Sequence, residues 1–552
     1  MPNVRRPPAL GRYGMVATSQ TLASLSGLDI LRSGGTAVDA ALAANAMLSL
    51  TEPHMCGPGG DLFALVWDPR EGKLHGLNAS GRSPAGQTID MLRAALGGRR
   101  PMPSRGALAV TAPGAVDGWC ALHERFGRLS LREIFAPAVD YAHAGFPVAR
   151  RTSAAWGCAA AELAREPLVA TQHGAFAATF LCDGAAPGAG QVMSNRALAH
   201  TLEVIAEGGR RAFYAGEAGE ALLACLGAAG AAFTAEDLAR DHAEWVAPLS
   251  TRYRGVDVFE LPPNGQGACV LQMLNILEHY PLASFGIASP EWWHVFLEAK
   301  KLVFEDRARY YADPATMDVP PSALLDARYA ARRAALIDPA RAGTDYRGGE
   351  IAVPGGDTSY LAAADQDGMM VSFIQSIFQA FGSGLVVPEL GFALQSRAAA
   401  FSLDPAHPNG YAPGKRPFHT IIPGFALRDG EPWLAFGVMG ADMQPQGQVQ
   451  VLVNQIDFGL DVQAAGDAPR MRHLGGAQPN GERLDGLGVV QYEAGFAPEL
   501  IAALAARGHR LQPTGDAPMH VVGGYQAVAR EAHRSVYWGA TESRFDGVAL
   551  GY

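Results

Sequence analysis

Apolar and polar positions along the chain predict a helix-rich first half and a second half that opens on a hairpin. Thr36-Ala-Val-Asp39 has the form of a capping box, in which Thr and Asp side chains bond each other's backbone amides. It predicts an alanine-rich helix that ends near Leu50. Spacings of three and four residues between apolar positions predict further helices over residues 131–144, 269–279 and 292–311.

Strand signals are strongest at two places. The apolar run 62–67 predicts a buried strand. In the second half, residues 358–364 predict a strand, Asp365-Gln-Asp-Gly368 a tight turn, and 369–376 the returning strand. The segment 341–357 just before this hairpin is rich in glycine and polar residues, which predicts an exposed linker.

Composition and charge narrow the class of protein. The 552 residues are 48% hydrophobic and only 18% charged, which excludes disorder as a description of the whole chain. The formal net charge of −10 argues against a nucleic-acid partner, which needs a basic surface. An anionic small substrate stays open, because one buried arginine is enough to bind a carboxylate. At about 150 residues per domain the length suggests three or four domains, and one large α/β unit is equally allowed.

Cysteines and the N-terminus indicate the compartment. The six cysteines are scattered without a C-x-x-C pair, which predicts reduced, buried thiols. No apolar stretch of a secretory signal follows the first ten residues, and no segment is long and apolar enough to span a bilayer. We therefore expect a cytoplasmic protein without a membrane contact.

Three familiar site motifs do not fit this sequence. No G-x-S-x-G nucleophile elbow is present. The loop Gly57-Pro-Gly-Gly60 lacks the lysine of a P-loop, which favours a tight turn. His294 and Glu298 lie one helical turn apart but lack the second histidine of H-E-x-x-H, which favours a packed helix pair. No metal and no cofactor is expected.

Thr358 is the candidate with the most specific chemistry. It follows the predicted linker and opens the hairpin that brings Ser376 back towards it. If the chain is cut before Thr358, the residue gains an α-amine with a pKa near 8 beside its own hydroxyl. That amine can take the hydroxyl proton at neutral pH, so that one residue acts as both nucleophile and base.

From Gly34 to the C-terminus the chain resembles the γ-glutamyltranspeptidase (γ-glutamyltransferase) family of N-terminal-nucleophile hydrolases. The resemblance rests on ordered blocks that cover nearly the whole chain. These are residues 35–40, 52–54, 59–60, 106–110, 113–114, 297–302, 306–309, 357–358, 365–368, 381–384, 413–417 and 452–460.

The resemblance implies a fold and a processing step. The family fold is an α+β, four-layer αββα sandwich. Autocatalytic cleavage of the zymogen would fall between Asp357 and Thr358. Residues 1–357 would form the large chain and residues 358–552 the small catalytic chain, together one domain. Further dimerisation of this heterodimer stays open.

The resemblance also implies roles for individual residues. Thr358 takes the place of the nucleophile, and Ser376 that of a hydroxyl that hydrogen-bonds it. Gly440 and Ala441 align with the two glycines whose backbone N–H groups form the oxyanion hole, and alanine still supplies an N–H. Arg82 falls where the family binds the α-carboxylate of its substrate, a role that suits a guanidinium.

The chain departs from the family pattern at the substrate site. His419 and Thr420 replace a pair of serines, and the acidic pair that binds the α-amino group aligns with Ala399 and Ala400. Arg397 lies just before them. A buried ammonium needs an acceptor partner, so glutathione-like donors should bind poorly. We expect Arg82, Arg397, His419 and Thr420 to contact a substrate that carries a carboxylate.

These departures resemble the acylase-like and amidohydrolase-like branch of the family, in which oxamate amidohydrolases, acylase-like enzymes and glutathione-hydrolase-like proteins all stay open. They imply hydrolysis of a small carboxylate-bearing amide of oxamate, glutaryl or γ-glutamyl type through an acyl-enzyme. The segment 403–413, where many members carry a lid, is short. A less covered acyl-enzyme is easier for water to reach, which favours water as the acceptor. Two alternatives stay open: a true γ-glutamyltransferase or glutathione hydrolase with acyl transfer, and an uncleaved member that only binds an anion through Arg82.

Overall fold

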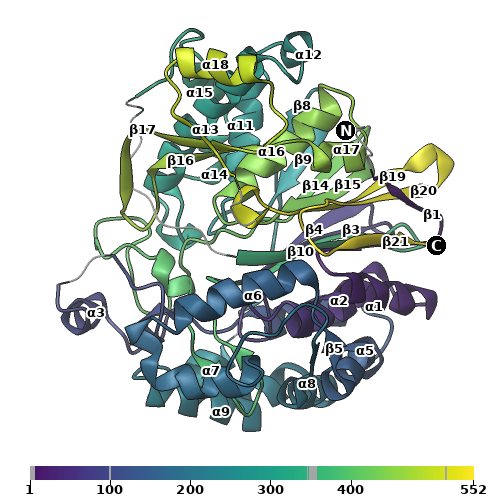
Figure 1. Cartoon of the computed structure of the whole chain (residues 1–552), viewed down its shortest axis with the longest axis vertical. Coiled ribbons are helices and arrows are strands. Elements are labelled where there is room, and N and C mark those ends of the chain that lie inside the picture. The colour runs from purple at the N-terminus through teal and green to yellow at the C-terminus, as the bar shows by residue number, and fades with distance from the viewer. Residues whose placement is uncertain (1–5, 99–100, 241, 345, 347–356, 516–518) are drawn as a thin grey trace.

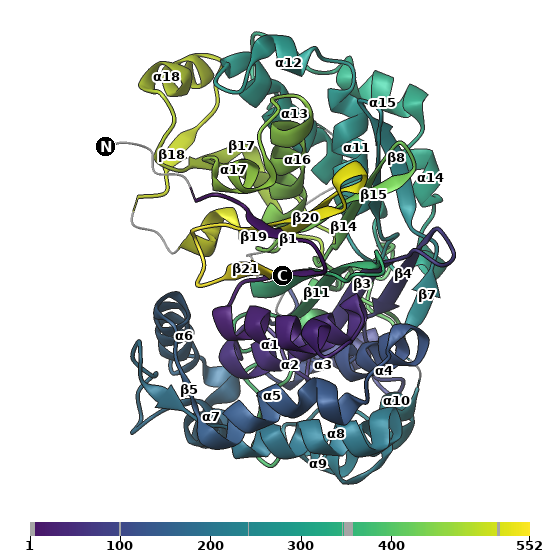
Figure 2. The same cartoon turned by 90° about the vertical axis from the view of Figure 1, so that its right-hand side faces the viewer.

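Two antiparallel sheets of seven strands stack face to face, and helices cover the outer face of each sheet (Figures 1 and 2). The computed structural model describes residues 6–98, 101–240, 242–344, 346, 357–515 and 519–552, without the side chains of 357, 484, 485, 519, 520 and 532. The layer order is the expected αββα sandwich, and this prediction is confirmed.

The predicted hairpin forms the centre of one sheet. Strands β10 (Asp357–Ala364) and β11 (Met370–Phe378) pair antiparallel across the Asp365–Gly368 turn. The returning strand therefore ends two residues later than predicted. In spatial order this sheet contains β21 (Val548–Gly551), β2 (Met15–Thr18), β10, β11, β3 (Asp61–Asp68), β4 (Lys73–Ala79) and β7 (Glu244–Val246).

The second sheet packs on the first through an apolar interior. Phe63, Tyr360, Ile374 and Phe425 are among the buried side chains between the two sheets. In spatial order the second sheet contains β1 (Ala9–Gly11), β20 (Val536–Thr541), β19 (Tyr525–Glu531), β15 (Glu431–Val438), β14 (Gly424–Arg428), β9 (Val256–Glu260) and β8 (Leu249–Tyr253).

Helix α2 (Ala37–Thr51) lies at the centre of one outer layer. The predicted capping box is present, with Thr36 and Asp39 each bonded to the other's backbone amide. All fifteen residues of α2 are buried, as expected of a helix that is apolar on every side. The same layer contains α1 (Thr21–Arg32), α4 (Ala115–Phe126), α5 (Leu131–Ala144), α6 (Arg150–Leu163), α7 (His173–Phe180), α8 (Arg196–Ala215) and α9 (Glu217–Ala228).

The opposite outer layer contains the helices α11 (Ala268–Leu277), α13 (Pro290–Tyr310) and α16 (Met443–Ile456). The predictions for the first two differ from the structure by one or two residues. Helix α13 begins earlier than predicted because Ser289 caps it and Pro290 is compatible with its first position. The layer also includes α12 (Leu282–Phe285), α14 (Pro321–Leu324), α15 (Ala327–Ala334), α17 (Val462–Asp467) and α18 (Pro498–Ala506).

Shorter elements complete the fold. Helices α3 (Ile89–Ala95) and α10 (Ala235–Ala239) lie in the first half of the chain. Small sheets join β5 (Phe146–Pro147) with β6 (Val192–Met193), β12 (Val386–Val387) with β13 (Phe392–Ala393), and β16 (Met471–Ala477) with β17 (Arg483–Tyr492) and β18 (Leu511–Pro513).

Both large sheets contain strands from either side of the Asp357–Thr358 bond. Strand β3 pairs with β11, and β9 pairs with β14, so the two segments share one pair of sheets. Of the predicted linker, residues 345 and 347–356 lie outside the described part of the chain.

The cysteines form no disulfide. Cys56, Cys120 and Cys269 are buried, but Cys158 is exposed, contrary to the expectation of buried thiols. None of the described helices combines the length and the apolar character that a membrane crossing requires.

Candidate active site

Thr358 lies buried in the central sheet, at an irregularity in the pairing of β10 with β11. Its Oγ1 donates a hydrogen bond to the Oγ of Ser376, 3.3 Å away. The Nε2 of Gln444, in the first turn of α16, lies 3.5 Å from the same Oγ1 as a donor. The structure therefore brings together the two hydroxyl residues that the sequence paired.

Arg397 extends this contact into a chain of hydrogen bonds. Its Nη2 donates to Ser376 Oγ at 2.8 Å and its Nη1 to Thr420 Oγ1 at 2.7 Å. The guanidinium lies over the ring of Phe378, 4.4 Å from the ring centre. Thr358, Ser376, Arg397 and Thr420 are thus one connected network.

The guanidinium of Arg397 is a buried charge without a direct ion pair among the described residues. The residue is fully buried, and no described carboxylate forms an ion pair with it. Its Nε has no hydrogen-bond partner among the described residues. Burial lowers the pKa of Arg397 to about 9, and the negative charge of Asp61 partly opposes this. The group is a cation at neutral pH, in a place where an uncompensated charge is costly.

Gly440 and Ala441 join β15 to the N-terminus of α16. Their φ angles are 112° and 47°, so the alanine adopts a left-handed conformation that costs about 1–2 kcal/mol. Gln266 stabilises this turn by donating from Nε2 to the Ala441 carbonyl oxygen at 2.9 Å. In the described part of the chain neither amide N–H has an acceptor. Two free donors at the positive end of a helix can stabilise an oxyanion.

His419 contacts Asp61 and not the network around Thr358. Its Nε2 donates to Asp61 Oδ2 at 3.0 Å, while its Nδ1 accepts the backbone N–H of Ile421 at 3.3 Å. This pattern is that of a neutral ring. Burial lowers the pKa of His419 to about 4, which agrees with the neutral form at pH 7.

Asp61 is the residue that the sequence analysis missed. The available signal in the sequence was an aspartate directly after Gly59-Gly60, at the start of an apolar run. In the structure its carboxylate is fully buried. Such a charge needs several donors, which only residues distant in sequence supply here.

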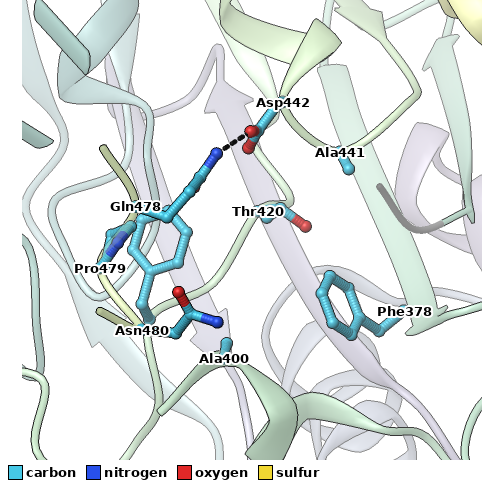
Figure 3. Close-up of a pocket in the computed structure, with 9 residues that line it drawn as sticks. Phe378, Ala400, Thr420, Ala441, Asp442, Gln478, Pro479 and Asn480 are labelled. Carbon is cyan, nitrogen blue, oxygen red and sulfur yellow. Dashed lines mark hydrogen bonds between the residues drawn. The ribbon is translucent and has the colours of Figure 1, made fainter. Parts of the chain in front are cut away.

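A small pocket of about 20 Å³ opens between Thr420, Ala441 and the loop after β16. Figure 3 shows Phe378 and the Pro479–Asn480 pair on opposite sides of Ala400 and Thr420 in this view. The lining residues are Phe378, Ala400, Phe418, Thr420, Ala441, Asp442, Gln478, Pro479 and Asn480. Most of this wall is apolar.

Asp442 supplies the one carboxylate among these lining residues, and it is already paired. Arg307 Nη1 lies 2.8 Å from its Oδ1, and Gln478 donates to its Oδ2. Burial alone would raise the pKa of Asp442, but the Arg307 guanidinium outweighs it and lowers the pKa below its usual value. None of the described lining residues therefore offers a free carboxylate to a substrate ammonium.

Arg82 is not among the residues that line the pocket, and no described hydrogen bond joins its side chain to the network of Thr358. Its side chain is 26% exposed, and its Nη1 contacts Asp313 Oδ2 at 3.5 Å and the Gly414 carbonyl oxygen at 3.3 Å. The predicted role of Arg82 in carboxylate binding stays a prediction.

His294 and Glu298 form a buried cluster with His509. Their ligand atoms are close enough to hold a metal ion. The two histidine rings are instead hydrogen-bonded to each other at 2.8 Å. The Lys301 ammonium, 2.7 Å from Glu298 Oε1, already supplies a positive charge there.

Comparison with known proteins shows similarity along the whole chain. The gamma-glutamyltranspeptidase family model matches residues 23–552. A glutathione hydrolase-like proenzyme of Bacillus subtilis is 37% identical over 549 residues, which cover 98% of this chain and 99% of that protein. An oxamate amidohydrolase proenzyme of Klebsiella pneumoniae is 36% identical over 98% of both chains.

A solved structure gives the same result. The crystal structure of a cephalosporin acylase from Bacillus halodurans superposes with a TM-score of 0.91 at 41% identity. The match covers 100% of this chain and 98% of the acylase.

Proposed function

The chain belongs to the gamma-glutamyltranspeptidase family, and we propose that it is an autoprocessed amidohydrolase whose nucleophile is Thr358. Its relatives include proenzymes that hydrolyse amides, and the chain is itself a hydrolase of amide bonds. The observation that carries the assignment of the nucleophile is the buried Thr358 hydroxyl, which is bonded to Ser376 and contacted by Gln444. Gln444 lies in the helical turn that directly follows Gly440 and Ala441 and donates its backbone N–H to the Ala441 carbonyl oxygen.

In the proposed mechanism the precursor is cut between Asp357 and Thr358 into chains of 357 and 195 residues. The freed α-amine of Thr358 accepts the proton of its own hydroxyl, and Oγ1 attacks the substrate carbonyl carbon. The N–H groups of Gly440 and Ala441 stabilise the oxyanion of the tetrahedral intermediate. The ammonium returns the proton to the leaving amine, and water then hydrolyses the ester on Oγ1.

The pocket favours an acyl group without an α-ammonium. Ala400 lines the wall, and the carboxylate of Asp442 is committed to Arg307. An ammonium in this pocket would lose its water without gaining an anionic partner, which is costly.

Thr420 is the proposed contact for the substrate's carboxylate. Its Oγ1 accepts a hydrogen bond from Arg397, and no described group accepts the hydrogen of its own hydroxyl, which can therefore donate into the pocket. The charge of Arg397 behind it adds to the attraction. His419 precedes Thr420 in the chain, and its hydrogen bond to Asp61, the first residue of β3, helps to hold Thr420 in place.

A pair of anilides tests the preference for the acyl group. Glutaryl-p-nitroanilide and γ-glutamyl-p-nitroanilide differ only in the α-amino group. We expect kcat/KM to be at least about tenfold higher for the glutaryl compound, because its acyl group carries no ammonium. Oxamate is tested as a third substrate. With the two anilides, the release of nitroaniline is expected not to accelerate when a dipeptide acceptor is added.

The alternatives give different results in this panel. A preference for the γ-glutamyl anilide with acceptor stimulation would identify a true γ-glutamyltransferase. Binding of the acids without turnover of any amide by an uncut chain would identify a binding-only member.

Two variants locate the carboxylate site. Thr420→Val keeps the shape of the side chain and removes its hydroxyl, so KM for the glutaryl anilide is expected to rise about tenfold. Arg82→Ala tests the site implied by the family resemblance, with Arg165→Ala as the control at an exposed arginine. A rise in KM for Arg82→Ala alone would assign the binding of the substrate's carboxylate to Arg82.

A further inference from the structure

Asp61 is a buried carboxylate directly beside the proposed nucleophile's partner. It is the first residue of β3 and pairs in register with Ser376 of β11, so their side chains are cross-strand neighbours. The side chain is fully buried. Four donors surround its two oxygens: Gly81 N at 2.9 Å, Gly114 N at 3.2 Å, His419 Nε2 at 3.0 Å and Gln395 Nε2 at 3.5 Å.

Ser376 thus lies between two opposite buried charges. Arg397 donates to its Oγ from one side, and Asp61 occupies the neighbouring strand position. The two charged groups form no direct ion pair, yet Asp61 is the one described group whose charge supports that of Arg397. Because Ser376 is hydrogen-bonded to Thr358, the charges of Asp61 and Arg397 also affect a positive charge on the α-amine of Thr358.

We propose that Asp61 is a positioning residue that fixes His419 and the Gly81 and Gly114 loops, and whose negative charge balances Arg397 at the α-amine of Thr358. The proposal rests on the function proposed above, because it needs a freed amine that acts as the base. Asp61 itself touches no reacting atom.

The charge of Asp61 favours the protonated form of that amine, and Arg397 opposes it. With both present, the amine keeps a pKa close to that of an ordinary N-terminus, in the range where it can act as base near neutral pH. The described charged or titratable groups around Thr358 and Ser359 come from several elements: Asp61, Arg397, His419, Asp442 with Arg307, Glu52 and Cys56.

Asp61→Asn tests the charge with little change in size. Loss of the negative charge leaves Arg397 uncompensated, so the amine loses its proton more easily. We expect the acid limb of the pH profile of kcat/KM to move about one unit to lower pH. Asp68→Asn is the matched control, because Asp68 is also buried and lies at the opposite end of the same strand. Its profile is expected to coincide with that of the wild type.

A second pair of variants covers the case in which Asp61→Asn does not fold or process. Arg397→Gln is expected to shift the acid limb to higher pH. The double variant Asp61→Asn/Arg397→Gln removes both charges of this pair, so neither is left buried without the other. Its acid limb is expected about one unit below that of Arg397→Gln alone.

The outcomes separate this role from the proposed function. An active, processed Asp61→Asn enzyme with an unshifted acid limb would overturn the role of Asp61 alone, as would equal limbs in Arg397→Gln and the double variant. A merely structural carboxylate would lower the yield of folded enzyme without moving the limb. Absence of turnover by the wild type on every amide would overturn the proposed function, and the role of Asp61 with it.

Discussion

Thr358→Ala is expected to remain a single polypeptide of 58.1 kDa and to lose at least about 10⁴-fold in turnover of every amide. The same hydroxyl attacks the Asp357–Thr358 bond in the precursor and the substrate in the processed enzyme, so one substitution removes both reactions. Denaturing gel electrophoresis of fresh protein reports the first, and amide hydrolysis reports the second.

Two neighbouring substitutions make this result specific. Thr358→Ser keeps a hydroxyl and a future α-amine, so it is expected to process slowly and to retain turnover. Ser359→Ala removes a hydroxyl from the next residue, which bonds Glu52, and is expected to process like the wild type. Two chains in the Thr358→Ala preparation, or an active wild type that stays uncut, would refute Thr358 as the nucleophile.

Arg307→Met is expected to cost about 3–5 kcal/mol of unfolding free energy at pH 7, because it removes the ion-pair partner of the Asp442 carboxylate, whose side chain is only 16% exposed. For a chain of 552 residues this corresponds to a fall in the thermal midpoint of about 3–4 °C. Measured in the uncut Thr358→Ala background, the value refers to one intact chain. Arg309→Met, on the exposed side of the same helix, is the control and is expected to leave the midpoint unchanged.

The loss of stability in Arg307→Met is expected to depend on pH. The folded-state pKa of Asp442 is lower than in the unfolded chain, so its stabilising contribution is complete above the unfolded pKa. That contribution is lost as the pH falls through the folded pKa. Without Arg307, burial raises the folded pKa instead, so protonation stabilises the variant. The gap in thermal midpoint is therefore expected to narrow below about pH 5, and a gap independent of pH would contradict this account.

Local signals in the sequence predicted the elements well where the partner of each contact is close in the chain. The capping box at Thr36 and the Asp365–Gly368 turn both depend on residues a few positions apart. The pairing of β1 with β20, or of β2 with β21, joins residues more than 500 positions apart, and no local pattern encodes it.

The same distinction holds in the candidate site. The closeness of Thr358 and Ser376 follows from one hairpin. Arg397 and Thr420 were expected to contact substrate, but their bond to each other and to Ser376 depends on how separate loops pack. The contacts of Arg82 with Asp313 and Gly414, and those of Asp61, are set by residues far along the chain and could not be read from it.

The position of Tyr552 has a consequence for how the free threonine can be made. Its backbone oxygen accepts hydrogen bonds from the amides of Arg12 and Tyr13, so residue 552 lies beside the turn that follows β1. A gene rearranged to start at Thr358 and to run through Tyr552 and a linker into the former N-terminus opens the chain only at the first residue of β10 and keeps the other described strand pairings. Removal of the initiator methionine would then expose the α-amine directly. Such a circular permutant would separate the chemistry of self-cleavage from the chemistry of turnover.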